Sequence, residues 1–386
     1  MKNAMKLVVD ANIPASEACF AEFGEVVRLP GREITAQHLQ DADALVVRSV
    51  TRVNQALLAD SSVRFVGTCT IGTDHIDTAY LSAREIAFAS APGCNAEAVV
   101  DYVLASLLTL AERQGWALTQ RCVGIVGVGN VGSRLLARLK ALGVKVLACD
   151  PPRAAQEGSA GFETLPTLIN HCDVLCLHTP LVTEGPHKTR HLLGSAEINA
   201  LKPGSIVVNA GRGDCMDSAA LAERLIQQAD LTAVLDVWEN EPDIDPQLHA
   251  LAALATPHVA GYSLDGKLRG SLMIHHALAE HLGHHSPLGL ADICPPPALG
   301  ELILQQAIPT EEALWVCMRA VYDPRRDHDR LAREMQQQSI GSAFDRCRAD
   351  YPLRREFATL KVRLRNDATS LAPRLRAAGF NVLSDT

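Results

Sequence analysis

The sequence of 386 residues lacks an excess of positive charge. Its formal net charge is -8, so it has no overall attraction for nucleic acid or for anionic membranes. An anionic ligand would have to be bound by a few local cations. The region after Asp323 is mildly basic, but its charges alternate in sign, as in YDPRRDHD, and no aromatic ladder accompanies them. We expect a solvated or subunit-facing surface there and no nucleic-acid partner.

Long apolar runs are also lacking. No stretch of about 18 uninterrupted apolar residues occurs, so we expect no transmembrane helix and no membrane partner. The opening stretch MKNAMKLVVD has neither the apolar core nor the small-residue cleavage site of a signal peptide. Both observations favour a cytoplasmic location.

A cysteine framework is absent as well. The eleven cysteines are odd in number and scattered through apolar runs, which is typical of buried thiols in a reducing compartment. Cys172 and Cys176 lie close to His171, but no second ligand pair follows at a spacing typical of zinc sites. We therefore expect no metal.

The composition, with 47% hydrophobic and 21% charged residues, is that of a globular enzyme, and the length suggests two or three domains. Short β-branched runs alternate with amphipathic stretches in the first ninety or so residues. This alternation predicts a doubly wound parallel sheet. The predicted strands are Lys6 to Asp10, Val26 to Leu29, Leu45 to Ser49, Arg64 to Thr68 and Ile86 to Ala91.

A long apolar segment from Asn95 to Glu112 contains no Gly or Pro and predicts a helix that links two domains. A second alternating series follows, and its near-continuous apolar cores are typical of strands covered on both faces. These cores are Val123 to Val126, Val144 to Cys149, Val174 to Leu177, Ser205 to Asn209, Thr232 to Val237 and the short ATPHVA around His258.

After residue 262 the pattern becomes helical, and Pro295, Pro296 and Pro297 form a stiff boundary. The predicted fold class is α/β, with a flavodoxin-like substrate or lid domain, a Rossmann domain and a C-terminal α+β domain. The predicted bounds are 1–94 with a returning helix at about 265–285, then 95–262, then 290–386. No internal repeat or low-complexity tract is present.

A glycine-rich loop separates the strand at Val123 from an amphipathic helix, in the sequence GVGNVG. Gly127 permits a tight turn, Gly129 lets the backbone approach a pyrophosphate, and Gly132 allows close helix packing. Phosphates would lie at a helix N-terminus, beside Asn130 and Val131, where free amides favour anions.

An acidic residue follows the next predicted strand at the spacing that a dinucleotide site requires. Asp150 lies eighteen residues after Gly132. Its carboxylate would accept hydrogen bonds from ribose hydroxyls and repel a 2′-phosphate, which predicts NAD as the cofactor. Two alternatives stay open: Asp150 is a turn residue before Pro151, or the nearby Arg153 admits NADP.

Three polar motifs follow successive predicted strands, at the sheet edge where α/β folds bind ligands: NAGRGD with Arg212, LDVWENEP with Glu241, and ATPHVAGY with His258. Oxidation of a 2-hydroxy acid needs a base, for which histidine has a suitable pKa. A glutamate can favour the protonated imidazole, and a guanidinium can bind a carboxylate in bidentate fashion. Each residue alone would be an ordinary turn residue, but together they predict a dehydrogenase site.

These motifs, with HTPL at His178 to Leu181, resemble the D-isomer-specific 2-hydroxyacid dehydrogenase family over about residues 6 to 285. The resemblance implies catalysis by Arg212, Glu241 and His258. It also implies contacts with NAD at Asp150, Thr179, Ala210, Arg212, Asp236 and Gly261.

Further segments are similar to one branch of that family. VRSVTRVN, GTCTIGTDHID and AGYSLDGK resemble its lid and hinge segments, and YDPRRDHD and FDRCRADYPLRREF resemble its C-terminal dimerisation domain. This similarity implies oxidation of 4-phospho-D-erythronate to 2-oxo-3-hydroxy-4-phosphobutanoate, a step in pyridoxal 5′-phosphate synthesis, by a homodimer. It also implies substrate contacts at Ser49, Thr70 and Tyr262, whose hydroxyls could bind polyol or phosphate oxygens.

Several alternatives remain at this point. Ser49 and Thr70 could only cap helices or turns, and the cation that reaches the phosphate could be Arg48, Arg52 or Lys267. Phosphoglycerate dehydrogenase would use the same triad, but its common tail should show a compact βαββαβ pattern, whereas residues 300–386 show arginine-rich helical runs. An NAD-binding regulatory module is a third interpretation.

Overall fold

The computed structural model describes residues 5–384, which form two compact units. One consists of the residues up to Asn95 together with Ser263–Pro296, and the other of Ala96–Tyr262 together with the residues from Pro297 onward. The first boundary between the units coincides with the start of the predicted long helix, and the last lies within the proline run. The division into three domains stays a prediction.

The first unit is built on a parallel sheet of five strands in the order β2-β1-β3-β4-β5. The strands are β1 (Met5–Asp10), β2 (Gly24–Leu29), β3 (Ala44–Val47), β4 (Phe65–Thr68) and β5 (Ala87–Ser90). This order is that of flavodoxin-like folds. The helices of this unit are α1 (Ser16–Phe20), α2 (Ala36–Leu39), α3 (Gln55–Leu58), α4 (Thr78–Ala83), α12 (Leu264–His281) and α13 (Leu290–Ile293).

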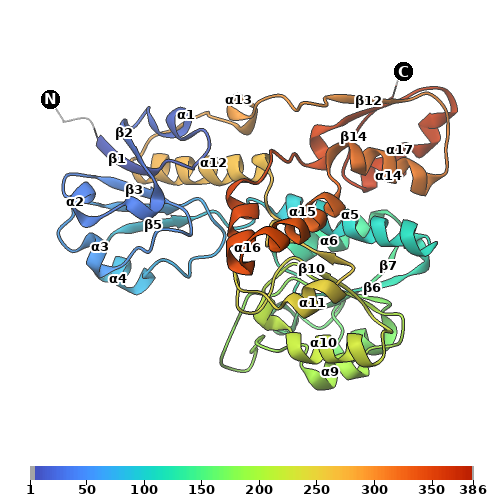
Figure 1. Ribbon diagram of the computed structural model, residues 1–386. Helices are drawn as coiled ribbons and strands as arrows, with labels where there is room; N and C mark the ends of the chain where they lie inside the picture. Colours follow the sequence, from blue (N-terminus) through green and yellow to red (C-terminus); the bar gives the residue numbers. More distant parts are fainter. Residues whose placement is uncertain (1–4, 385–386) are drawn as a thin grey trace. The chain divides into compact units, whose positions relative to one another are not determined.

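Helix α12 returns to the first unit late in the chain and packs on its sheet (Figure 1). Ile274, Leu278 and Ala279 join the core formed by the β1 side chains Leu7 and Val9. A Cβ atom at Gly67 on β4 would lie 2.3 Å from Ile274 Cγ2. Only glycine therefore allows this helix to approach the strand so closely.

The second unit contains a parallel sheet of six strands in the order β11-β10-β9-β8-β6-β7. The strands are β6 (Cys122–Val126), β7 (Lys145–Cys149), β8 (Val174–Leu177), β9 (Ile206–Asn209), β10 (Thr232–Leu235) and β11 (Leu254–Ala255). Its helices are α5 (Ala96–Gln114), α6 (Asn130–Ala141), α7 (Pro151–Glu157), α8 (Leu165–His171), α9 (Ser195–Ala200), α10 (Ser218–Gln227) and α11 (Pro246–Leu251). The order reverses beside β6, which creates a switch point between β6 and β8.

Both faces of this sheet are buried, as its apolar strands predict. On β8, Val174 and Cys176 point into the core shared with α5, whereas Leu175 and Leu177 point into the core shared with α8 and α9. Alternate residues of one strand therefore stabilise opposite layers. Each fully buried side chain of this size contributes about 1.5–3 kcal/mol.

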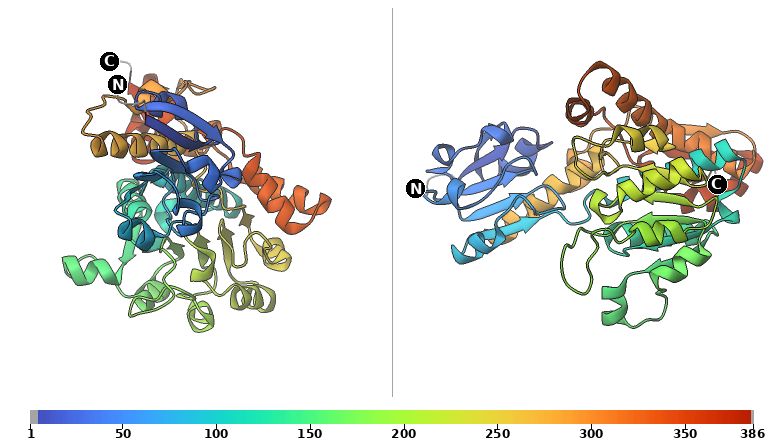
Figure 2. Two further views of the ribbon diagram at one scale, coloured as in Figure 1. Left: turned by 90° about the vertical axis from the view of Figure 1, so that its left-hand side faces the viewer. Right: turned by 60° about the horizontal axis from the view of Figure 1, so that its bottom comes forward.

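The C-terminal segment belongs to the second unit and packs on α5 and α6 (Figures 1 and 2). Its strands β12 (Glu301–Leu304), β13 (Lys361–Leu364) and β14 (Asn381–Ser384) form a parallel sheet. Its helices are α14 (Thr310–Val321), α15 (Pro324–Gln337), α16 (Ile340–Ala349) and α17 (Ala372–Ala377). The predicted α+β class of this segment is confirmed, although the positions of its three strands were not predicted.

The predicted α/β class with two parallel, doubly wound sheets is confirmed. The predicted strands begin and end within about two residues of the observed ones, with one exception. The segment ATPHVA was predicted as a strand, but β11 ends at Ala255, so His258 lies in a loop. Among residues 5–384, no helix is both long enough and apolar enough to cross a membrane.

Candidate active site and cofactor site

The glycine-rich loop joins β6 to α6 in the way its sequence predicts. Gly127 has a φ angle of +86°, a conformation that other residues rarely adopt. A Cβ atom at Gly132 would lie 2.0 Å from the carbonyl oxygen of Gly127, so the helix can approach the strand only because this residue has no side chain. A Cβ atom at Gly129 would meet nothing within 4 Å. The exposed Gly129 and Asn130, and the half-buried Val131, therefore leave the helix N-terminus open to a ligand.

The loop lies at the switch point of the sheet. A Cβ atom at Gly127 would lie 2.8 Å from the main-chain carbon of His178 and 2.9 Å from Thr179 Cγ2, which follow β8. The buried Thr179 hydroxyl donates to Cys215 Sγ at 3.3 Å. Neither ring nitrogen of His178 has a hydrogen-bond partner among the described residues, and burial lowers the pKa of His178 to about 4. This imidazole is therefore neutral at pH 7.

Asp150 follows β7 and caps helix α7. Its Oδ1 accepts a hydrogen bond from the Arg153 amide at 3.1 Å, and its Oδ2 accepts one from the Val128 amide at 2.8 Å. The alternative role of Asp150 as a turn residue is thus confirmed by its bond to the Arg153 amide. The same carboxylate also fixes the glycine-rich loop through the Val128 amide. Arg153 pairs with Glu157 at 2.8 Å and donates to the Val128 carbonyl at 2.6 Å.

The NAGRGD loop follows β9. Buried Asn209 fixes its backbone, since its side chain accepts from the Gly211 amide at 3.2 Å and donates to the Arg212 carbonyl at 3.1 Å. Ala210 follows β9 directly, and Thr179 follows the neighbouring strand β8 at the same edge of the sheet. The half-buried Arg212 side chain donates to its neighbour, the Gly211 carbonyl, at 2.8 Å.

The structure brings Glu241 and His258 together. Glu241 Oε2 lies 2.8 Å from His258 Nδ1, and Glu241 Oε1 accepts from the Trp238 amide at 2.9 Å. Burial opposes ionisation of Glu241, but the hydrogen bond and charge of His258, with the Trp238 amide and the charge of Arg348, lower its pKa. The carboxylate is therefore ionised at pH 7 and accepts from Nδ1–H, which leaves Nε2 of His258 to exchange a proton.

Asp236 holds the backbone of the loop that carries His258. Its Oδ1 accepts from the Val259 amide at 2.8 Å and from the Thr256 hydroxyl at 2.6 Å, and its Oδ2 accepts from the Ala260 amide at 2.9 Å. His258 itself has a φ angle of +55°. A strand cannot accommodate this conformation, which explains why the predicted strand at ATPHVA is wrong.

Arg354, from the C-terminal segment, binds the other side of the same loop. It donates to the carbonyl oxygens of Val259 at 3.3 Å and Ala260 at 3.0 Å, and to that of Ala98 at 2.6 Å. Only 3% of Arg354 is exposed, and its guanidinium carbon lies 3.6 Å from the ring centroid of Tyr322. The loop is therefore held through its amides by the carboxyl group of Asp236 and through its carbonyls by the guanidinium of Arg354.

The charge on Arg354 is maintained despite its burial. Burial disfavours the guanidinium, but Tyr322, Tyr351, Asp101 and Asp327 outweigh this effect and raise the pKa of Arg354. Both phenols donate to Asp327 Oδ2, at 2.9 and 2.7 Å. Sequence reasoning did not find Arg354 as a functional residue, because the carbonyl oxygens that it binds lie more than ninety residues away in the chain.

Arg212 lies at the same sheet edge as the other two predicted catalytic residues. The strands that precede the three motifs, β9, β10 and β11, are neighbours in the sheet. A Cβ atom at Gly213 would lie 2.0 Å from the carbonyl carbon of Trp238, so the loop after Arg212 contacts the loop that leads to Glu241. Among the described residues no hydrogen bond or ion pair joins Arg212 to Glu241 or His258.

The predicted substrate contacts fall in both units. Tyr262 follows Gly261 in the loop after His258, and its ring meets Tyr351 edge-on at 5.5 Å. In the other unit, Ser49 is exposed after β3, whereas Thr70 donates to the Gly72 carbonyl at 3.1 Å and contacts Thr68. Thr70 thus has the turn role that the sequence left open.

The three cations proposed for the phosphate lie in the first unit. Arg48 pairs with buried Asp10 at 3.0 Å, so a protein carboxylate already neutralises part of its charge. Arg52 and Lys267 are exposed.

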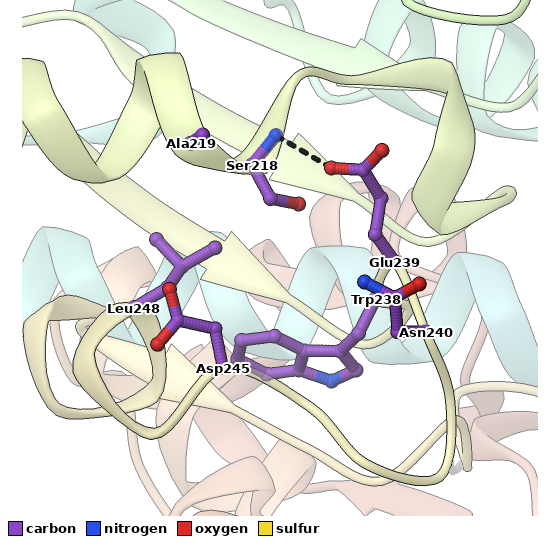
Figure 3. A pocket seen from close by; sticks show the side chains of 7 residues that line it. All are labelled: Ser218, Ala219, Trp238, Glu239, Asn240, Asp245 and Leu248. Carbon is purple, nitrogen blue, oxygen red and sulfur yellow. Dashed lines mark hydrogen bonds between the residues drawn. The ribbon is translucent and has the colours of Figure 1, made fainter.

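A cavity of about 170 Å³ lies beside the loop that precedes Glu241 (Figure 3). It is lined by Ser218, Ala219, Trp238, Glu239, Asn240, Asp245 and Leu248. The Glu239 carboxylate accepts from the Ser218 amide at 2.9 Å and lies 2.7 Å from His191 Nε2. None of the predicted catalytic residues lines this cavity, so it is not the predicted active site.

Two family models match parts of this chain. Residues 101–260 match the model of the D-isomer specific 2-hydroxyacid dehydrogenase NAD-binding domain, and residues 293–379 match a domain of unknown function, DUF3410.

Full-length relatives include two proteins named erythronate-4-phosphate dehydrogenase. One, from Chromohalobacter salexigens, is 52% identical over 98% of this chain and 99% of its own. The other, from Azotobacter vinelandii, is 54% identical over 97% of this chain and 99% of its own. Among solved structures, the TT0316 protein from Thermus thermophilus matches with a TM-score of 0.60 and 27% identity, over 73% of this chain and 99% of that chain.

Proposed function

The chain belongs to the D-isomer specific 2-hydroxyacid dehydrogenase family, and on this premise we propose that it oxidises 4-phospho-D-erythronate to 2-oxo-3-hydroxy-4-phosphobutanoate with NAD. The observation that carries the proposal is the hydrogen-bonded pair of Glu241 and His258, at the edge of the sheet where Arg212 also lies. The relatives named for this substrate match over nearly the whole chain, which favours it over 3-phosphoglycerate.

The residues at the switch point fit a dinucleotide. The open N-terminus of α6 would bind the pyrophosphate, and the free lone pairs of Asp150 would accept from the ribose hydroxyls. We place the rest of the cofactor along the edge of the sheet beside this loop. The residues there are Thr179, Ala210 and Asp236, which follow β8, β9 and β10, and Gly261 in the loop after β11. When bound, NAD supplies the acceptor for the hydride that leaves C2.

His258 is the base in this proposal. With Nδ1–H donated to Glu241, Nε2 takes the proton of the C2 hydroxyl. The ionised carboxylate stabilises the imidazolium that results, and in the reverse direction the same nitrogen returns the proton. Glu241 thus orients the ring and balances its charge.

Arg212 is the substrate clamp. Its guanidinium would bind the C1 carboxylate in bidentate fashion and polarise the C2 oxygen, which favours the developing carbonyl. The backbone beneath it is fixed by Asn209 and by the contact of Gly213 with Trp238. Such a preorganised cation needs little rearrangement when substrate binds.

The test is the formation of NADH from three acids: 4-phospho-D-erythronate, unphosphorylated D-erythronate and 3-phosphoglycerate. The proposal predicts rapid reduction with the first acid only. Equal rates with the first two acids would show that the enzyme does not select for the phosphate. A higher rate with 3-phosphoglycerate would show that this acid, and not 4-phospho-D-erythronate, is the substrate.

We also propose that the C-terminal segment forms a homodimer interface. Several large apolar side chains are exposed on it, including Leu353, of which 81% is exposed. The others are Leu299, Ile303 and Val316.

We further propose a reducing, cytoplasmic environment, since all eleven cysteines are free and most are buried.

A further inference from the structure

Helix α16 of the C-terminal segment packs directly on the loop that follows Glu241. A Cβ atom at Gly341 would lie 2.5 Å from Asp243 Oδ1 and 3.5 Å from Pro242 Cγ. Only a residue without a side chain lets the helix approach so closely. The start of α16 therefore has a fixed position next to a predicted catalytic residue.

Phe344 and Arg348 lie on the same face of α16 as Gly341, because residues three and seven positions apart share one side of a helix. Phe344 is fully buried. The Arg348 guanidinium carbon lies 5.8 Å from the ring centroid of Phe344 and 5.8 Å from that of Tyr262. The helix thus carries a cation to Tyr262, four residues after His258.

Arg348 has no carboxylate partner within residues 5–384, and its buried Nε has no hydrogen-bond partner there. By contrast, the exposed Arg346 on the same helix lies 3.8 Å from carboxylate oxygens of both Glu334 and Asp350. Two aromatic rings offset part of the desolvation of the half-buried guanidinium, but an anion would offset much more.

The charge of Arg348 also affects the catalytic pair. Burial raises the pKa of Glu241, but the contacts with His258 and Trp238 lower it, and the charge of Arg348 adds to this lowering. The guanidinium is therefore close enough to act on this carboxylate through space. Since Arg212 is assigned to the C1 carboxylate, a second cation near the site suits the second anionic group of the substrate.

We propose that Arg348 binds the phosphate of the substrate, with Tyr262 supporting its guanidinium. The proposal rests on the proposed function. In 4-phospho-D-erythronate the phosphate is separated from C2 by C3, C4 and the ester oxygen, so one cation can bind it while another binds the carboxylate. A planar guanidinium suits this dianion because it donates two parallel hydrogen bonds. The C-terminal segment would then contribute directly to substrate selection.

The test compares Arg348→Gln and Arg348→Lys with Arg346→Gln, a matched control on the same helix. We expect Arg348→Gln to lower kcat/KM for 4-phospho-D-erythronate by about 10- to 100-fold, mainly through KM. Turnover of unphosphorylated D-erythronate, measured at high concentration, should stay within about twofold. Arg348→Lys should recover part of the loss, and Arg346→Gln should behave as the unchanged enzyme.

Two results would overturn the proposal: equal losses on both acids in the Arg348 variants, or no loss on either. Inhibition by inorganic phosphate gives an independent readout, which should weaken in Arg348→Gln and stay constant in Arg346→Gln. If Arg348→Gln does not fold, Arg348→Lys is compared with the unchanged enzyme on the same two acids. A loss confined to the phosphorylated acid is again the expected result. A failure of the proposed function would look different, because the unchanged enzyme itself would then show no preference for the phosphorylated acid.

Discussion

The guanidinium of Arg354 donates a hydrogen bond of 3.0 Å to the main-chain oxygen of Ala260, two residues after the proposed catalytic base. This bond ties a loop of the dehydrogenase core to a segment that follows the core in the sequence. Because Asp236 binds the amides of the same loop, its backbone has little freedom to move. The geometry of His258 therefore depends on the C-terminal segment.

We expect Arg354→Met to destabilise the protein by about 3–5 kcal/mol, because it leaves three carbonyl oxygens and a buried acidic cluster without their cation. We also expect kcat to fall, since the base is less well oriented. Urea unfolding and steady-state kinetics measure the two effects. Arg354→Lys should recover part of both, and exposed Arg326→Gln serves as the control. An unfolding free energy within about 1 kcal/mol of the unchanged protein would contradict this role.

The second and third glycines of the cofactor loop should respond differently to alanine. Gly132→Ala places a Cβ atom 2.0 Å from the Gly127 oxygen, so the helix must shift, at a cost of about 1–3 kcal/mol. Gly129→Ala meets no protein atom within 4 Å and should leave stability unchanged. It should nevertheless weaken NAD binding about tenfold, because its methyl group would occupy the pyrophosphate position. Thermal unfolding and NADH fluorescence titration distinguish the pair, and equal loss of stability in both variants would contradict this assignment.

These contacts show which features of the site the sequence could reveal. Gly132 is needed because of Gly127, five residues away, and Gly127 is needed because of its own positive φ angle, so a short motif predicts both. The roles of Asp236 and Arg354 arise from contacts between distant segments. The loop conformation at His258 has the same origin, and local apolar character wrongly predicted a strand there. The positions of strands β12, β13 and β14 were not predicted, because each mixes polar with apolar residues and their sheet joins segments far apart in the sequence.

Asp150 should control the choice between the two nicotinamide cofactors. Asp150→Asn retains an acceptor for the Val128 amide, which the carboxylate now binds at 2.8 Å, but removes the charge that repels a 2′-phosphate. We expect the ratio of kcat/KM for NAD to that for NADP to fall by about 10- to 100-fold. Parallel assays with both cofactors measure this ratio. An unchanged ratio would mean that Asp150 acts only as the cap of α7.

His249 should make the protein less stable in mild acid. Burial, followed by the charge of His328, lowers the pKa of His249 to about 4, whereas the unfolded chain has a value near 6.5. As the pH falls from about 6.5 towards 4, the unfolded state gains a proton that the folded state does not bind. Stability is therefore lost across this window, by up to about 3 kcal/mol at its acid end. Denaturant unfolding at several pH values measures it.

His249→Gln should reduce that pH dependence, since one titrating group is gone, while buried His178 keeps its own contribution. Exposed His285→Gln is the matched control and should keep the slope of the unchanged protein. If His249→Gln and the unchanged protein lost stability in parallel between pH 6.5 and 4, other groups would be responsible.

The most direct test of the account is a single-turnover measurement of NADH formation by His258→Asn in saturating 4-phospho-D-erythronate. The asparagine can still contact Glu241 but cannot accept the hydroxyl proton, so we expect the rate to fall by about 100- to 10,000-fold with NAD affinity unchanged. A rate within a few-fold of the unchanged enzyme would contradict the central claim that this imidazole is the base.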